Sequence, residues 1–169
     1  METVKNACRG HLFALPKVFL QKPLTKQIGK CTIQTRGDNM RAIYAETYEG
    51  KLLGAEHFTG KEFRCKDGTK EFLYCIELIE VLEKIRKHFN EPVIINSGYR
   101  TPEWNKKVGG AKNSYHMKGM AADIVVKNHS SKEVAEYASK ALSELDGGVI
   151  RYTNFVHVDV REHKYRKGV

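Results

Sequence analysis

The sequence has no long hydrophobic run and no internal repeat, and each absence excludes a class of protein. No window of its 169 residues approaches the roughly 18 consecutive apolar residues that a membrane-spanning helix needs. With 41% hydrophobic and 29% charged residues, the composition excludes a disordered chain. A chain of this length buries about 70% of the surface that its unfolded form exposes, so we expect one domain, or one domain with an arm.

Cysteine is too sparse for a disulfide framework. The four cysteines are Cys8, Cys31, Cys65 and Cys75. They form no Cys-x-x-Cys pair, so we expect reduced thiols, with Cys75 on the buried stripe of a helix. The N-terminus is also a poor match to a secretory signal, because its apolar stretch is broken by Pro16 and Lys17. We therefore expect synthesis in the cytoplasm without a secretory signal.

Acidic residues are almost absent from the N-terminal part of the chain. Residues 1–36 hold seven cations and one anion, whereas the remaining residues hold 22 cations and 19 anions. Clustered cations favour a polyanion such as nucleic acid or an anionic cell-wall polymer, and a solvated basic face is the alternative. Since Phe13 and Phe19 are the only aromatic residues of residues 1–36, no base-stacking platform is predicted and we do not expect a nucleic-acid partner.

Hydrophobic periodicity predicts an α+β fold with a largely antiparallel sheet flanked by helices. Strands are expected over 28–35, 41–48, 92–96, 121–126, 149–152 and 155–160, and helices over 70–89, after Thr101 and from Ser130 through Leu145. The turn chemistry of residues 37–39 joins the first two strands into a hairpin. We divide the chain into a basic N-terminal arm with this possible hairpin (1–56) and a main domain (57–169).

Two short stretches carry candidate chemistry. His116 and Asp123 flank a glycine-containing turn that can fold the imidazole over the start of the strand 121–126. In the strand 155–160, His157 and Asp159 share one face because side chains two residues apart point the same way, and the valines face the other side. Two imidazoles and a carboxylate suit a catalytic zinc site with an open position for an activated water, although the same set also holds iron or another divalent metal. Spacing alone leaves open that these histidines are structural.

Four ordered blocks of the sequence carry a family resemblance. They are Ser97-Gly98-Tyr99-Arg100 with Asn105, then Gly109-Gly110, then Ser-x-His-x-x-Gly-x-Ala-x-Asp at 114–123, and Phe-Val-His-Val-Asp-Val-Arg at 155–161. Together they resemble the zinc D,D-peptidase family, which includes D-Ala-D-Ala carboxypeptidases and phage endolysins and shares its fold with hedgehog signalling domains. The resemblance covers about residues 57–163, and it implies the hedgehog-like fold of that family.

The resemblance also implies roles for individual residues. One zinc ion per chain would be held by His116, Asp123 and His157. Arg100 matches the arginine that pairs with the terminal carboxylate of the substrate, a task that suits the rigid guanidinium fork, and the alternative is a surface cation at a helix start. Ser114 either binds substrate or holds its loop. Tyr99 either lines the substrate pocket or packs.

The general base of the family has no counterpart at its usual place. Many members carry Glu, Asp or His two or three residues before the last zinc ligand, where this sequence has Phe155 and Asn154. Asp159 is the candidate base. The alternative for Asp159 is a carboxylate that accepts the free N–H of a zinc-bound histidine and fixes its tautomer. Glu162 and His163 are further candidates for the base.

These features predict a zinc-dependent peptidase that hydrolyses peptidoglycan stem peptides at the bacterial cell wall, as a D-Ala-D-Ala carboxypeptidase or an endopeptidase. The basic arm would concentrate it on anionic wall polymer, and no membrane partner is expected. A phage lysis enzyme is compatible with the expected lack of a signal. Two alternatives stay open: a non-catalytic, zinc-stabilised binding domain of the hedgehog-like type, and a polyanion-binding protein that acts through the arm.

Overall fold

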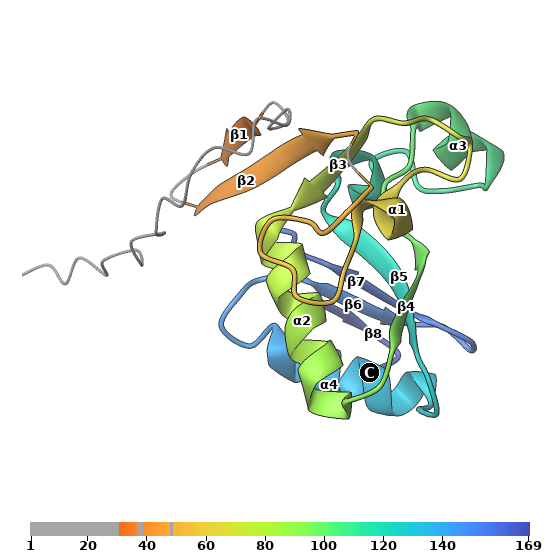
Figure 1. Ribbon diagram of the computed structural model, residues 1–169. Helices are drawn as coiled ribbons and strands as arrows, with labels where there is room; N and C mark the ends of the chain where they lie inside the picture. Colours follow the sequence, from red (N-terminus) through yellow and green to blue (C-terminus); the bar gives the residue numbers. More distant parts are fainter. Residues whose placement is uncertain (1–30, 37–38, 48) are drawn as a thin grey trace, which may run out of the picture.

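The computed structural model describes residues 31–36, 39–47 and 49–169, which form two β-sheets and the helices around them (Figure 1). The smaller sheet is antiparallel, in the order β1 (Cys31–Arg36), β2 (Asn39–Glu46), β3 (Phe72–Cys75). The larger sheet has the order β4 (Val93–Ser97), β5 (Ala121–Val126), β7 (Val156–Asp159), β6 (Gly148–Arg151), β8 (Tyr165–Lys167). Neighbouring strands of this sheet run antiparallel except β8, which pairs parallel with β6. The expected α+β class with a mostly antiparallel sheet is therefore confirmed.

Helices cover one face of the larger sheet. The helical elements are α1 (Gly60–Phe63), α2 (Ile76–Phe89), α3 (Pro102–Lys107), the 3₁₀ helix η1 (Tyr115–Lys118) and α4 (Ser131–Ala141). α2 packs on β4 and β5 and α4 packs on β5, β6 and β7, while the two helices contact each other (Figure 1). The short helices α1 and α3 lie at the end of the molecule where β3 is found. None of the helices in the described ranges has the length and apolar character to cross a bilayer.

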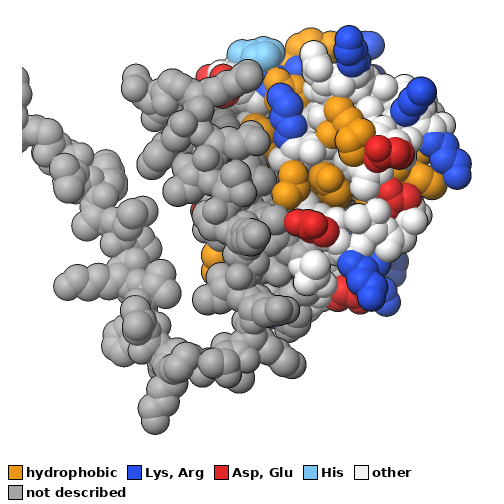
Figure 2. Space-filling view, turned by 90° about the horizontal axis from the view of Figure 1, so that it is seen from above, with side chains coloured by type: hydrophobic (Ala, Val, Ile, Leu, Met, Phe, Trp, Pro, Cys, Tyr) orange, Lys and Arg blue, Asp and Glu red, His pale blue; other side chains and the backbone are white. Residues whose placement is uncertain are grey.

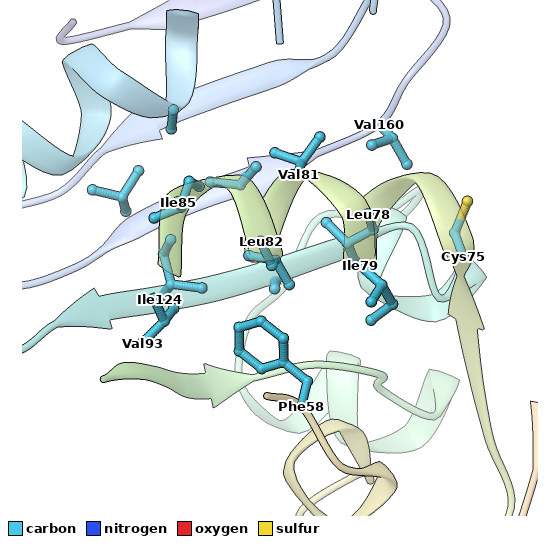
Figure 3. Packing of buried hydrophobic residues seen from close by; sticks show 14 of the residues in the cluster. Phe58, Cys75, Leu78, Ile79, Val81, Leu82, Ile85, Val93, Ile124 and Val160 are labelled. Carbon is cyan, nitrogen blue, oxygen red and sulfur yellow. The ribbon is translucent and has the colours of Figure 1, made fainter. Parts of the chain in front are cut away.

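The core forms between α2 and the sheet. Leu78, Ile79, Leu82 and Ile85 recur on one side of the helix and are fully buried. Figure 3 shows these side chains meeting Phe58, Val93, Ile124 and Val160. Each buried side chain of this size contributes about 1.5–3 kcal/mol relative to an exposed one, so this layer fixes the sheet on which the polar residues stand.

The helix expected over 70–89 is wrong at its beginning. Residues 72–75 form strand β3, which pairs with β2 from Glu46↔Phe72 to Ile43↔Cys75, and the helix begins only at Ile76. Aromatic and apolar residues in this stretch fit a pleated, half-buried surface, and the neighbouring strand supplies the partner that favours the extended form. Cys75 is buried as expected, but it precedes the helix as its N-cap residue.

The other expected elements are confirmed with shifted ends. The first two strands pair as a hairpin over 31–36 and 39–46, while the predicted residues 28–30, 37–38 and 48 lie outside the described residues. Thr101 caps α3 by accepting a hydrogen bond from the Trp104 amide at 3.1 Å. The last helix ends at Ala141 and not at Leu145, because the chain leaves the helix in a turn that leads into β6. Strand β8 was not expected.

Charge is spread over the face seen from above in Figure 2. Lys and Arg side chains surround hydrophobic ones there and alternate with acidic side chains, so no continuous basic patch is visible on this face. The basic residues of the predicted arm fall mostly on residues 1–30, outside the described ranges. The boundary predicted between residues 56 and 57 stays a prediction.

Candidate metal centre

The strand pairing brings two of the predicted ligands side by side. Asp123 on β5 lies directly opposite His157 on β7. Their sequence neighbours Ile124, Val156 and Val158 are buried in the core under the helices. Because side chains alternate along a strand, the carboxylate and the imidazole emerge on the opposite face of the sheet. The predicted division into a valine face and a polar face is thus confirmed.

The third predicted ligand comes from η1, just before β5. η1 ends at Gly119, whose φ of 68° is left-handed and where a Cβ would lie 2.5 Å from the carbonyl carbon of Leu73. Only glycine therefore lets the chain turn this closely past β3 and enter β5. The turn leaves His116 only 2% exposed, with its Nδ1 2.7 Å from the carbonyl oxygen of Gly98.

The three side chains direct one atom each to a common point. His116 Nε2 lies 3.2 Å from Asp123 Oδ1, and His157 Nδ1 lies 2.9 Å from the same oxygen. The two nitrogens are 3.2 Å apart. Tetrahedral zinc with ligands at about 2.0–2.2 Å separates neighbouring ligand atoms by roughly 3.3–3.6 Å, so small side-chain movements would let this triangle hold a zinc ion.

The far side of each imidazole offers an acceptor for a ring proton. A carbonyl oxygen only accepts hydrogen bonds, so His116 Nδ1 donates to Gly98 and a neutral His116 keeps a lone pair on Nε2. His157 lies between two carboxylates, with Nε2 3.0 Å from Asp159 Oδ2 and Nδ1 2.9 Å from Asp123 Oδ1. A metal ion at the centre would replace the proton at Nδ1 and leave the Nε2 proton for Asp159, so that all three converging atoms could act as ligands.

Burial and hydrogen bonding act in opposite directions on the ionisation of these groups. Burial alone would raise the pKa of Asp123, but hydrogen bonds and charge from His116 and His157 hold that pKa well below its usual range. Burial alone would lower the pKa of His157, but Asp123 and Asp159 raise it. The site therefore favours the ionised carboxylate, as a metal ligand requires.

Asp159 is fully buried and completely paired. Its Oδ1 accepts from the amide and the Nε of Arg161, at 3.1 and 2.8 Å, and its Oδ2 accepts from Arg161 Nη2 and from His157 Nε2. Burial raises the pKa of Asp159, but the Arg161 and His157 hydrogen bonds more than offset this and hold it well below its usual range. This carboxylate stands behind the His157 ring, on the side away from the three converging atoms.

Arg100 contacts a predicted ligand. Its Nη2 donates to Asp123 Oδ2 at 2.5 Å and its Nε donates to Ser97 Oγ at 2.8 Å. The carboxylate of Asp123 is therefore held from both sides, with one oxygen on the guanidinium and the other on the histidines. The structure thus brings Arg100 to the site, in contact with the protein's own carboxylate.

The remaining predicted residues lie around this centre with different surroundings. Ser114 is buried at the start of η1, and its hydroxyl makes no capping hydrogen bond. Tyr99 packs against the hydrophobic core, and its amide donates to the carbonyl of Phe63. Glu162 and His163, the secondary candidates for the base, are both exposed after β7.

Three contributors were missed from the sequence: the Gly98 carbonyl, the Ser97 hydroxyl and the Arg161 guanidinium. All three stand in the matched blocks, but no role was derived for them. A backbone carbonyl leaves no signal in a side-chain pattern. For Arg161 a signal existed, because a cation two residues after Asp159 shares its face if the extended backbone continues.

A second group with metal-ligand chemistry lies elsewhere, and its members contact one another and Lys87. Ligand atoms of Glu56, His57 and Glu83 lie within 4.8 Å of one another. The buried Glu83 accepts from the amides of Glu56 and His57 and contacts His57 Nδ1, while Lys87 pairs with Glu56. These contacts tie the loop before α1 to α2.

Comparison with known proteins finds a family match over the part of the chain that holds the centre. Residues 56–159, which include all three converging side chains, match the family described as Peptidase M15. The peptidoglycan L,D-endopeptidase MepK of Escherichia coli (strain K12) is 38% identical over 76 residues, and the protein of that name in Shigella flexneri matches equally. The alignment covers 41% of this chain and 40% of each relative, so the match spans about two fifths of their length.

Proposed function

Because the chain belongs to the Peptidase M15 family, we propose that it is a zinc-dependent peptidase that cleaves peptidoglycan stem peptides. The observation that carries the proposal is the convergence of His116 Nε2, Asp123 Oδ1 and His157 Nδ1 to within 3.2 Å of one another. The substrate class rests on the resemblance to D,D-peptidases and on the similarity to MepK, whose name describes a peptidoglycan endopeptidase. That similarity favours endopeptidase over carboxypeptidase action.

The three converging atoms would hold the zinc ion, and the surrounding residues would fix their directions. Zinc supplies Lewis acidity for the attack of water on a peptide carbonyl. The Gly98 carbonyl orients His116, and Arg100 together with Ser97 orients Asp123. Two imidazoles and one carboxylate form the set of three protein ligands that catalytic zinc sites use.

We assign Asp159 to the orientation of His157 and not to the role of base. Each of its oxygens already accepts two hydrogen bonds, and its side chain is completely inaccessible to solvent. A general base needs a free lone pair within reach of the attacking water. Glu162 and His163 stay candidates for the base, since both are exposed close to the end of β7.

We propose that Arg100 still contacts a substrate carboxylate, but through fewer hydrogen bonds than a bidentate pair would make. Its Nε and Nη2 are engaged with Ser97 and Asp123, so the bidentate pairing through that edge of the guanidinium is taken by the protein. We infer a single contact through Nη1. Such a contact orients a substrate carboxylate near the scissile bond.

Digestion of purified, cross-linked peptidoglycan tests the proposal. Full-length protein with verified zinc content is compared with His157→Ala and with the matched control His57→Ala, a histidine of the second cluster. Mass spectrometry of the products is expected to show cleaved stem peptides with the parent and His57→Ala and none with His157→Ala. Cleavage within the cross-linked peptides would indicate an endopeptidase. Release of free D-alanine would indicate a carboxypeptidase. A zinc-loaded parent that cleaves nothing would overturn the enzyme proposal in favour of a non-catalytic binding domain.

A further inference from the structure

The guanidinium of Arg161 lies between two aromatic rings. Its Cζ is 4.8 Å from the centre of the Tyr115 ring and 4.7 Å from the centre of the Tyr165 ring. Tyr115 belongs to η1 and directly precedes His116, whereas Tyr165 begins β8 near the end of the chain. A cation held over ring faces is attracted by their negative electrostatic potential and loses freedom to turn.

The space for this arginine is reserved by a neighbouring strand. Gly148 on β6 lies opposite Asp159, and a Cβ at this position would come within 2.3 Å of Asp159 Oδ2 and 2.7 Å of Arg161 Nε. Its φ is not in the left-handed region, so the backbone would accept other residues. Glycine is therefore required at this position by packing, because a side chain would occupy the space of the ion pair, and not by its backbone conformation.

The pair acts on the metal centre through one hydrogen bond. Asp159 Oδ2 lies 3.0 Å from His157 Nε2, so the position of this oxygen sets the ring angle of His157 and would hold the Nε2 proton when a metal ion occupies Nδ1. A buried carboxylate that loses its cation is strongly destabilised where it stands, and Asp159 would turn toward other donors. The direction of His157 Nδ1 thus depends on Arg161 through Asp159.

We propose that Arg161 is a positioning residue, clamped by Tyr115 and Tyr165, which couples the C-terminal strand β8 to metal affinity at His157. The inference deepens the proposed function and rests on its metal site. β8 is itself anchored, because the Tyr165 amide donates to the Gly147 carbonyl and Arg166 donates to Ser139 Oγ and to the same carbonyl. The last strand therefore holds one side of the clamp in place.

Zinc affinity measured by competition with a chelating dye tests the proposal on the full chain. Arg161→Gln is expected to bind zinc about 10–100-fold more weakly than the parent, the usual loss when an orienting partner of a ligand is removed. Lys118→Met is the matched control. The Lys118 ammonium lies 5.0 Å from the same Tyr115 ring, but the hydrogen bonds of Asp159 come from Arg161 and His157, so this variant should keep the affinity of the parent.

A second pair of variants separates the clamp from general folding. Tyr165→Phe keeps the aromatic face and should retain zinc affinity, whereas Tyr165→Leu keeps much of the volume, removes the ring and should weaken zinc binding. Nitrogen NMR of the zinc-loaded protein gives an independent readout, because the His157 Nε2 proton should be held by Asp159 and exchange slowly with water in the parent and Tyr165→Phe, and exchange faster in Arg161→Gln. If Arg161→Gln does not fold, the Tyr165 pair decides.

Three outcomes overturn the inference: unchanged zinc affinity in folded Arg161→Gln, equal affinity of the two Tyr165 variants, or an equal loss in Lys118→Met. These measurements are separate from peptide cleavage. A parent that binds zinc and cleaves nothing would refute the proposed function and leave the clamp intact. Normal cleavage and normal zinc affinity in Arg161→Gln would refute the clamp and leave the proposed function intact.

Discussion

Zinc should stabilise the parent protein and fail to stabilise Asp123→Ala. A ligand that binds only the folded state adds about 2.7 kcal/mol when its free concentration is 100 times its Kd. For a chain of this size, each kcal/mol moves Tm by about 2–4 °C. Buffered zinc at that concentration should therefore raise the Tm of the parent by about 5–10 °C over the chelated protein.

The same substitution has a cost without metal. Asp123 accepts a hydrogen bond from Arg100, whose side chain is 16% exposed, so alanine leaves a largely buried cation without its partner. Breaking a buried ion pair costs about 3–5 kcal/mol, and we expect about 3 kcal/mol because Arg100 keeps its hydrogen bond to Ser97. The chelated variant should thus melt below the chelated parent, and zinc should not restore the difference.

Differential scanning fluorimetry in chelator and in a zinc buffer measures both effects. His57→Ala serves as the control, because His57 belongs to the second group of possible ligand residues. We expect its zinc-induced shift to equal that of the parent. The reasoning fails if zinc raises the Tm of Asp123→Ala as much as that of the parent, or if the shift disappears in His57→Ala alone.

Three further predictions concern parts of the chain outside the centre. Burial raises the pKa of Glu83, but hydrogen bonds from His57 and two amides lower this pKa below its usual value. The ionised Glu83 therefore stabilises the folded protein above the unfolded-state pKa of about 4.3, and this stabilisation is lost as the pH falls through the pKa of the folded state. Urea unfolding between about pH 6 and 3 should therefore show a steeper loss of stability for the parent than for Glu83→Gln, and parallel curves would contradict this. Leu82→Ala should lower the free energy of unfolding by about 2–5 kcal/mol, because Leu82 is completely buried, and a loss below about 1 kcal/mol would show that the site collapses freely. Deletion of residues 1–30 should abolish salt-dependent sedimentation with anionic cell-wall polymer without changing the zinc-induced Tm shift, and binding that survives the deletion would refute the role of the arm.

Local sequence pattern was sufficient to predict the structure where a residue's surroundings are set by its own strand or helix. Alternation in 155–160 placed His157 opposite the valine face, and the capping residues placed the starts of α3 and α4. The stretch 72–75 shows the limit of this reasoning. Its apolar residues continue the helical period of α2, and only the pairing with β2, some 30 residues earlier, selects the extended form.

Contacts between distant segments account for what the sequence did not predict. β8 pairs in parallel with β6, and no short-range pattern in a three-residue strand indicates such a partner. The clamp around Arg161 joins η1, the end of β7 and β8, which are separated by up to 50 residues. Its members are recognisable only after the sheet has been assembled.

The two histidines of the centre are oriented by chemically different means, and this difference has a consequence for how the site varies. His116 is fixed by the backbone carbonyl of Gly98, an acceptor that remains after any side-chain substitution. His157 is fixed by Asp159, whose position depends in turn on Arg161. Of the two histidines, His157 is therefore the one whose direction a side-chain substitution can change, so substitutions that tune metal affinity through a histidine without replacing it should concentrate on Asp159 and Arg161.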